Sequence, residues 1–285
     1  MDLVTSFITS AKFARHEYEE YVVPVIESES NVAASDHTTH ALEYAHTLAF
    51  RSGLGSSLFA NPHHAVTVED IKSFATSVFS KGNIAVLGTG IDQATLSKLV
   101  DKALSSAPSA AAPSSSPSTY FGGGTRVDSG SGPQTIFIGY GVVGPSEPAI
   151  AALSAYLSPA PALKWSKGLS PLSEMPLGTS IQSVYLPYSD ATLFGLLVQG
   201  ATTAGVKEAG KLAVKALKEA GGVKADDLKK ALAKAKFAAA SSIDSRDGII
   251  NLLGPKVGLL LIVNTPNSCI CSRSSLVLTH PSILL

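Results

Sequence analysis

The pattern of apolar and polar positions predicts two helices in the first fifty residues. Apolar residues recur at helical spacing between Phe7 and Tyr18, and Pro24 then predicts an interruption. A second helix is expected to begin near Asp36, because an aspartate directly before a helical stripe is a favourable N-cap. The stretch "RSGLGSSLFANPHH" that follows has the composition of a loop.

The next fifty residues predict a helix, a strand and another helix. "TVEDIKSFATSVF" begins with Thr67, and Asp70 three residues later completes a pattern that resembles a capping box. "GNIAVLGTG" is typical of a short buried strand, and "DQATLSKLVDKAL" has the spacing of a helix.

Residues 105–119 are almost entirely Ser, Ala and Pro, with too little apolar bulk to pack, and we interpret them as a linker. Beyond the linker, "GTRVD" and "PQTIFIGYGV" predict strands and "EPAIAALSAYL" predicts a helix. "SIQSVYLPY" and "ATLFGLLVQG" predict two more strands. Two long helices are expected near 203–220 and 224–242.

The second of these long helices combines an apolar stripe with a basic face. The residues expected to be buried are Leu228, Ala231, Leu232, Ala235 and Ala238. Lys229, Lys230, Lys234 and Lys236 lie mostly off this stripe. We interpret the nine lysines between 207 and 236 as a solvated face and not as a nucleic-acid footprint. The whole chain has 22 basic and 22 acidic side chains, so no net charge attracts nucleic acid.

Residues 257–285 differ from the rest of the chain, because they have no acid, one base (Arg273) and no sustained periodicity. They contain both cysteines, Cys269 and Cys271, so the preceding 268 positions hold no disulfide and no cysteine-based metal site. The longest uninterrupted apolar run, 258–263, is far shorter than the roughly 18 to 20 residues of a membrane span. We interpret this segment as a tail not native to the fold, with a short hydrophobic C-terminal tail as the alternative.

Three histidines and a glutamate at three-residue intervals raise the question of a metal site: His37, His40, Glu43 and His46. Each residue of an α-helix advances by about 100°, so the four side chains spread around the helix and cannot meet at one ion. His46 is expected on the buried side with Leu42, while His37 and His40 are expected to be solvated. A neighbouring pair such as His40 and Glu43 can still share a ligand. Neither H-E-x-x-H nor H-x-x-E-H occurs in the chain.

A second candidate is "GYGVVG", a literal G-x-G-x-x-G formed by Gly139, Gly141 and Gly144 between a strand and a helix. It lacks the context of a dinucleotide site, because Pro145 and Pro148 crowd the helix start and no acid lies about twenty residues further on. "FGGG" is better interpreted as a turn than as a phosphate cradle. We therefore assign no catalytic, cofactor-binding or metal-binding residue.

Four segments together carry a family resemblance: "AKFARHEYEEYVVPVIESES", "HALEYAHTLAFRSGLGSSLFANP", "VTVEDIKSFATSVFSKGNIAVLGTGID" and "TYFGGGTRVDSGSGPQTIFIGYG". They resemble the core protein 2 family of the mitochondrial ubiquinol-cytochrome c reductase, respiratory complex III. That family is similar to the insulinase-type metallopeptidases and the mitochondrial processing peptidases. The resemblance covers about residues 8–256 and rests on many ordinary segments.

The resemblance implies an α+β fold of two similar domains, each a mostly antiparallel sheet with packed helices. Residues 1–104 would be the C-terminal part of the first peptidase-like domain, which is incomplete. Residues 105–119 would be the linker and residues 120–256 the second domain, cut short. Residues 257–285 are the atypical tail.

In active members of the superfamily, an H-x-x-E-H motif lies before the region with which this chain begins, and a downstream glutamate completes the zinc site. Glu27 or Glu29 falls only roughly at that third position, and one carboxylate does not hold zinc. A glycine-rich loop of the processing peptidase's non-catalytic subunit is expected near "LSPAPALKWSKGLSPLSE", which carries only Gly168. The chain thus departs from both peptidase subunits.

The resemblance therefore implies a non-catalytic structural subunit on the matrix side of the mitochondrial inner membrane, with no transmembrane span and no cofactor. Its implied partners are core protein 1, cytochrome b and cytochrome c1. A targeting presequence is expected upstream, because Asp2 and the acidic "HEYEEY" favour a folded helix at the start of this chain. The alternatives are a zinc metallopeptidase or processing peptidase subunit whose motif is missing here, and a mispredicted fragment without function.

Overall fold

The computed structural model describes residues 2–60, 66–81, 83–88, 90–105, 107–108, 116–128, 130, 132–161, 170–244, 248 and 276–277. The chain divides into two compact units whose segments alternate along the sequence. Unit 1 comprises 1–27, 61–116 and 243–285, and unit 2 comprises 28–60 and 117–242. The segments of the two units alternate along the sequence, whereas the predicted domains follow one another. The predicted domain boundaries stay a prediction.

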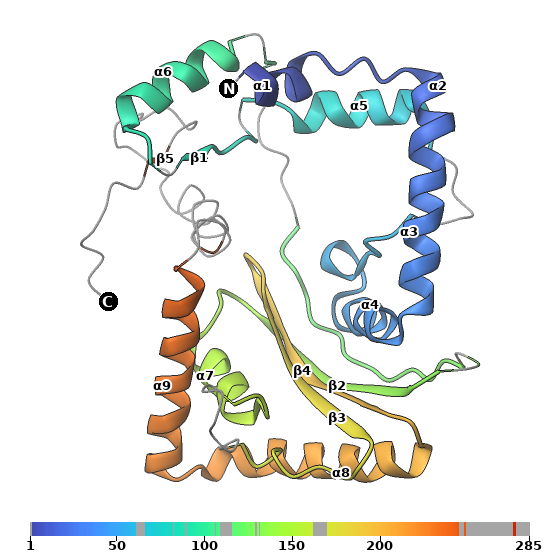
Figure 1. The fold of residues 1–285 in the computed structure, drawn as a ribbon, viewed down its shortest axis with the longest axis vertical. Coiled ribbons are helices and arrows are strands. Elements are labelled where there is room, and N and C mark those ends of the chain that lie inside the picture. Colours follow the sequence, from blue (N-terminus) through green and yellow to red (C-terminus); the bar gives the residue numbers. More distant parts are fainter. Residues whose placement is uncertain are drawn as a thin grey trace. The chain divides into compact units, whose positions relative to one another are not determined.

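Unit 2 contains an antiparallel sheet with strand order β2–β4–β3, covered by helices (Figure 1). Its strands are β2 (Gln134–Val143), β3 (Thr179–Pro187) and β4 (Ala191–Gly200). Its helices are α4 (His37–Phe50), α7 (Pro148–Leu157), α8 (Thr203–Glu219) and α9 (Ala225–Ser242), with short 3₁₀ turns at Gly53–Gly55 and Ala220–Gly222. The described fold is therefore α+β, and the three strands and the two long helices are confirmed.

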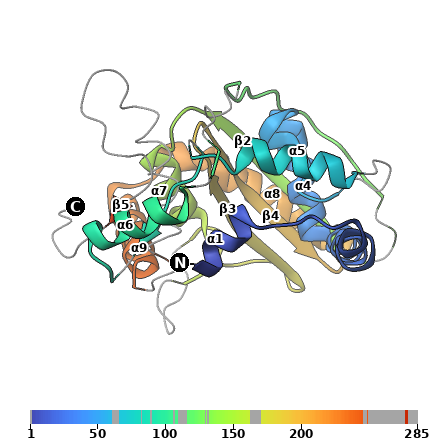
Figure 2. The same cartoon turned by 90° about the horizontal axis from the view of Figure 1, so that it is seen from above.

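Strand β4 is buried on both faces, which explains its nearly continuous run of apolar residues. Phe194, Leu196 and Val198 pack into one core cluster with residues of α7 and α8. On the other face, Leu193 packs with Phe50 of α4. The sheet thus lies between α4 on one side and α7 with α8 on the other, and both views show α9 beside α7 (Figures 1 and 2).

Unit 1 has a smaller core. Its elements are α1 (Asp2–Thr9), α2 (Arg15–Glu17), a π-helical turn (Tyr18–Val22), α5 (Val68–Val78), β1 (Leu87–Gly88), α6 (Gln93–Ala103) and β5 (Leu276–Val277), which pairs in parallel with β1. α3 (Val23–Ser35) belongs partly to each unit. Leu96, Val100, Leu104 and Ala107 form the buried cluster. The predicted capping box of Thr67 and Asp70 is confirmed at the start of α5.

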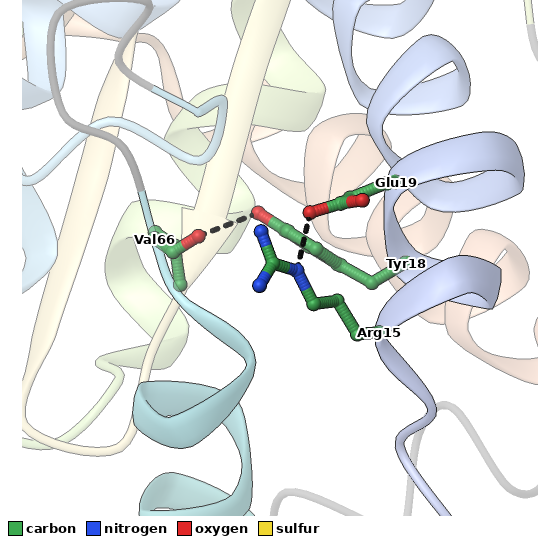
Figure 3. Close-up of polar contacts among 4 residues, drawn as sticks. All are labelled: Arg15, Tyr18, Glu19 and Val66. Atoms are coloured by element: carbon green, nitrogen blue, oxygen red, sulfur yellow. Dashed lines mark hydrogen bonds and ion pairs between the residues drawn. The ribbon is translucent and has the colours of Figure 1, made fainter.

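The predicted interruption at Pro24 is wrong. The chain breaks earlier, at residues 10–14, where Phe13 has a φ of 48°. The π-helical turn directly before α3 shifts the hydrogen-bond register, which accommodates a proline that has no N–H to donate. A hydrogen bond anchors the π-helical turn: the Tyr18 hydroxyl donates to the carbonyl of Val66, just before α5, at 2.8 Å (Figure 3). The Arg15–Glu19 pair beside it is exposed and contributes little to stability.

Two predicted strands are also corrected. "GTRVD" at 124–128 is irregular, because Gly122 and Gly123 with φ of 71° and 146° turn the chain just before it. "GNIAVLGTG" contributes only Leu87–Gly88 to a ladder, because β5 is a partner of two residues. No helix in the described part of the chain is long and apolar enough to cross a membrane.

The apolar stripe predicted for α9 is only partly buried. Ala231 is buried, but Leu228 and Leu232 are exposed. α9 packs against α7, which is much shorter and covers only a narrow strip of the longer helix. The prediction that Leu228 and Leu232 are core residues is therefore wrong.

Candidate functional site

Asp36 is the N-cap of helix α4, as predicted. One carboxylate oxygen of Asp36 accepts from the Thr38 amide at 3.2 Å, and the other accepts from the Thr39 amide at 3.1 Å and from the Thr39 hydroxyl at 2.6 Å. The hydrogen bond from the Thr39 side chain is the main reason that the pKa of Asp36 is lowered. This cap fixes the first turn of α4 and therefore the directions of the histidines that follow.

His46 points inward, as predicted, and joins α4 to the β3–β4 hairpin. Its Nδ1 lies 2.7 Å from the Leu42 carbonyl, which can only accept, so in the neutral ring Nε2 is left as an acceptor. The Tyr188 hydroxyl lies 2.7 Å from Nε2 and donates to it. Tyr188 lies in the hairpin turn, where its amide donates to the Ala191 carbonyl at 2.8 Å. Burial raises the pKa of the Tyr188 phenol.

The prediction that His37 and His40 are solvated is wrong, because both are half-buried. The His40 ring lies 5.0 Å from the Tyr44 ring, and the His37 ring packs against Gly132. Both rings line a groove that runs beside strand β2, because this side of α4 faces along the sheet. Glu43 accepts from the Ser57 hydroxyl, and this side chain holds the loop after α4.

Across the described residues, no three His, Cys, Asp or Glu side chains gather into a group that could hold a metal ion. Glu27 and Glu29 are both exposed on α3. Gly168, Cys269 and Cys271 lie outside the described residues.

Two of the three glycines of "GYGVVG" serve packing, whereas Gly144 follows β2 with a φ of 117° and has no atom within 4 Å of a would-be Cβ. Gly139 and Gly141 lie within β2, and Gly139 is opposite Gly195 of β4. A Cβ atom at Gly195 would come within 2.5 Å of the Phe137 ring and 2.7 Å of the Ile138 carbonyl oxygen. The pair of glycines therefore leaves space for the Phe137 ring against the sheet.

Lys234 corrects the interpretation of the lysines as a wholly solvated face. It is half-buried, and its ammonium group donates to the carbonyls of Ser158 at 2.9 Å and Ala160 at 2.6 Å, just beyond the end of α7. Burial lowers the pKa of this ammonium group. The cause is the packing of α9 on α7, which the periodicity of α9 alone does not reveal.

A groove of about 1080 Å³ follows β2 from Gln134 to Gly141. Its walls come from α4, from residues 120–127 and from the first half of α8. It contains Arg126, Lys207 and Lys211, and none of its lining residues is Asp or Glu. No sequence pattern predicted this groove, because it forms from four segments far apart in the chain. The one sequence feature that points to the groove is the four-residue spacing of Lys207 and Lys211, which places both lysines on one side of α8.

Comparisons with known proteins place the chain in a family. The family model described as the peptidase M16 inactive domain matches residues 65–235. The cytochrome b-c1 complex subunit 2, mitochondrial, of Cryptococcus neoformans var. grubii is 37% identical over 265 residues, which are 90% of this chain and 61% of that protein. The protein of the same name from Yarrowia lipolytica is 34% identical over 258 residues, 89% of this chain and 61% of that protein.

Among solved structures, a chain of complex III2 from Candida albicans with Inz-5 bound matches with a TM-score of 0.68. It is 16% identical and the match covers 93% of this chain and 65% of that chain, so this likeness concerns the fold alone. The chain spans about 61% of the length of the first two curated relatives. The resemblance drawn from the sequence is confirmed, and the chain belongs to the family of the peptidase M16 inactive domain.

Proposed function

We propose that this chain is a non-catalytic structural subunit of the mitochondrial ubiquinol-cytochrome c reductase, respiratory complex III. The observation that carries the proposal is its similarity, at 37% and 34% identity, to proteins named cytochrome b-c1 complex subunit 2. Subunit 2 of the b-c1 complex is the core protein 2 of the sequence resemblance. The family model that matches the chain describes the inactive type of peptidase domain, which supports a structural role.

The chemistry of the described side chains supports the same role. Two of the four side chains that suggested metal binding have hydrogen-bond partners within the fold: His46 bonds Leu42 and Tyr188, and Glu43 bonds the loop after α4. Gly139 and Gly141 lie in a strand and make no phosphate loop.

The proposal includes a location and partners. The chain would lie on the matrix side of the mitochondrial inner membrane, pack against core protein 1, and support cytochrome b and cytochrome c1, without a cofactor of its own. It would have the consecutive organisation inferred from the sequence, with residues 105–119 as a linker between peptidase-like domains. Limited proteolysis that cleaves within 105–119 before any other site is the result expected for that organisation.

The proposal is tested by co-migration. The epitope-tagged chain is expressed in Yarrowia lipolytica, and the mitochondria are solubilised in digitonin and separated on a native gel. We expect the chain in the band that contains cytochrome b, and a tagged matrix protein of similar size outside it. A Gly195→Arg variant, which places a large side chain against the Phe137 ring, is expected to leave that band.

Absence of the chain from the cytochrome b band contradicts the proposal. Cleavage of a presequence peptide by the purified chain, lost on addition of a zinc chelator, would instead support the peptidase alternative.

A further inference from the structure

Residues 118–121 belong to no helix or strand, yet hydrogen bonds hold this short segment at both ends. The Ser118 amide donates to the Asp190 carboxylate at 2.8 Å, although the two residues are 72 positions apart. The Phe121 amide donates at 2.9 Å to the carbonyl of Ala49, in the last turn of α4. We call residues 118–121 the strap. Both of its anchors lie within unit 2, as the strap itself does.

Between the two anchors, the ring of Tyr120 packs on the sheet. A Cβ atom at Gly141 of β2 would come within 2.5 Å of the Tyr120 ring and within 3.2 Å of the Phe50 ring. The missing side chain at Gly141 therefore leaves the space that the Tyr120 ring occupies. Tyr120 still keeps 43% of its surface exposed. A segment with so little buried apolar surface opens at a lower free energy than the sheet beneath it.

The end of α4 that the strap contacts has a strained backbone. Arg51, the C-cap residue of α4, has a φ of 59° and a ψ of −74°, which costs energy in any residue other than glycine. Its guanidinium carbon lies 4.3 Å from the centroid of the Phe121 ring, within the range of a cation–π contact. This contact helps to hold the strained cap, so the closed strap and the conformation of Arg51 depend on each other.

Two glycines follow the strap directly. Gly122 and Gly123 have φ of 71° and 146°, values that glycine adopts readily. A Cβ atom at Gly122 would also come within 3.1 Å of the Tyr120 hydroxyl oxygen. Because a few residues with a free backbone are enough to absorb the movement of a neighbouring segment, this pair can serve as a hinge.

We propose that the strap opens and closes as one unit on the hinge at residues 122–123. A pull on the chain before Ser118 is thereby transmitted to the last turn of α4, because release of the Asp190 anchor also releases Phe121 from Arg51 and Ala49. The proposal concerns coupling within unit 2. It goes beyond membership of a respiratory complex and does not depend on it.

Amide hydrogen exchange on the full chain, resolved to single residues, tests the proposal. Asp190→Ala removes one anchor of the strap. We expect exchange at the Phe121 amide, at the opposite end, to become about five- to thirtyfold faster. Asp128→Ala is the matched control, because it removes a carboxylate that accepts from the Gly130 amide beyond the hinge. This control should leave the Phe121 rate unchanged.

The reciprocal change starts from the other anchor. Arg51→Ala removes the cation above the Phe121 ring, and we expect the Ser118 amide to exchange about two- to fivefold faster. Arg51→Gly also loses this contact, but glycine adopts a φ of 59° without strain. The closed strap then no longer has to hold a strained cap, so the acceleration at Ser118 should be smaller than in Arg51→Ala.

Coupling between the two ends decides the outcome. An unchanged Phe121 rate in Asp190→Ala overturns the proposal, as does an unchanged Ser118 rate in Arg51→Ala. The Gly144 amide shows whether the hairpin turn stays intact, because it donates to the backbone carbonyl of residue 190 at 2.7 Å. If Asp190→Ala also exposes Gly144, the same criterion is applied to Asp190→Asn, which keeps an acceptor oxygen. Faster exchange at Phe121 with Gly144 protected then supports the strap, and an unchanged Phe121 refutes it.

Discussion

His46 Nε2 lies 2.7 Å from the Tyr188 hydroxyl oxygen, and the two residues are 142 positions apart in the sequence. The bond joins α4, in the first quarter of the chain, to the turn of the β3–β4 hairpin. Because the Leu42 carbonyl fixes the tautomer of the neutral ring, the phenol is the donor in this bond. This pair of side chains is one of the contacts that fix where α4 lies along the sheet, together with the hydrogen bond from Gln199 of β4 to Thr38 and the packing of Phe50 on Leu193.

Replacing Tyr188 by Phe is expected to lower the free energy of unfolding by about 1 kcal/mol, because His46 Nε2 loses its donor in a half-buried position. Urea denaturation followed by circular dichroism measures the change. Tyr185→Phe is the control, since it removes a phenol hydroxyl that bonds Ser146 at an exposed site. Equal losses in the two variants would show that the His46 contact has no special weight.

Asp36→Ala is expected to cost about 1 kcal/mol of stability at neutral pH, because the amides of Thr38 and Thr39 lose the carboxylate that caps α4. Asp36→Asn should cost less, since an asparagine side chain also caps a helix. Asp101→Ala, an exposed aspartate inside α6, should change stability very little. The ranking is read from urea midpoints, and a loss in Asp101→Ala as large as in Asp36→Ala would contradict it.

The cap also predicts a pH dependence. The pKa of Asp36 in the folded chain lies below its ordinary value of 3.8, so the unfolded chain takes up this proton more readily. The contribution of Asp36 is therefore complete above about pH 4 and is lost as the pH falls through the lowered pKa. The difference in stability between the natural chain and Asp36→Asn should shrink over this acid range. A difference that stays constant from pH 6 to pH 2 would exclude this linkage.

Lys234→Met is expected to destabilise the chain by about 1–2 kcal/mol, because the Ser158 and Ala160 carbonyls lose their donor while the aliphatic contact is kept. Lys236→Met is the matched control on an exposed position of the same helix. Urea denaturation distinguishes the two. A neutral Lys234→Met would mean that water satisfies both carbonyls equally well.

Two glycine-to-alanine changes should act in opposite directions. Gly195→Ala forces a Cβ atom against the Phe137 ring and the Ile138 carbonyl, and we expect a loss of about 1–3 kcal/mol. Gly210→Ala, in the interior of α8, meets no atom within 4 Å and should gain about 0.5–1 kcal/mol from helix propensity. Thermal unfolding of both variants gives the signs, and a stabilised Gly195→Ala would refute the packing role of this pair.

The sequence predicted local structure correctly where an interaction between residues close in the chain determines it. Asp36 and Thr67 begin helices because the groups that they cap lie within three residues. The strands at β3 and β4 were predictable for a related reason, since β-branched and aromatic residues between turn signals favour extended backbone.

The predictions that were wrong concern residues whose environment depends on tertiary structure. Pro24 sits in a helix because a π-helical turn shifts the hydrogen-bond register just before it, and no spacing rule predicts that turn. The predicted burial of Leu228 and Leu232 assumed a partner helix as long as α9, whereas α7 is shorter. His37 and Lys234 were expected in solvent because helical periodicity places a side chain on its own helix but not against its neighbours.

The double burial of β4 has a consequence for the order in which this chain can fold. Its two apolar faces need α4 and α8, and the hairpin contact of α4 lies 142 residues further along the chain. At about 5–20 residues per second, a ribosome needs roughly 7 to 28 seconds to complete that distance. During that interval no sheet covers the Phe50 side of α4. A nascent chain of this sequence therefore exposes an apolar helix face for long enough that chaperones can bind it.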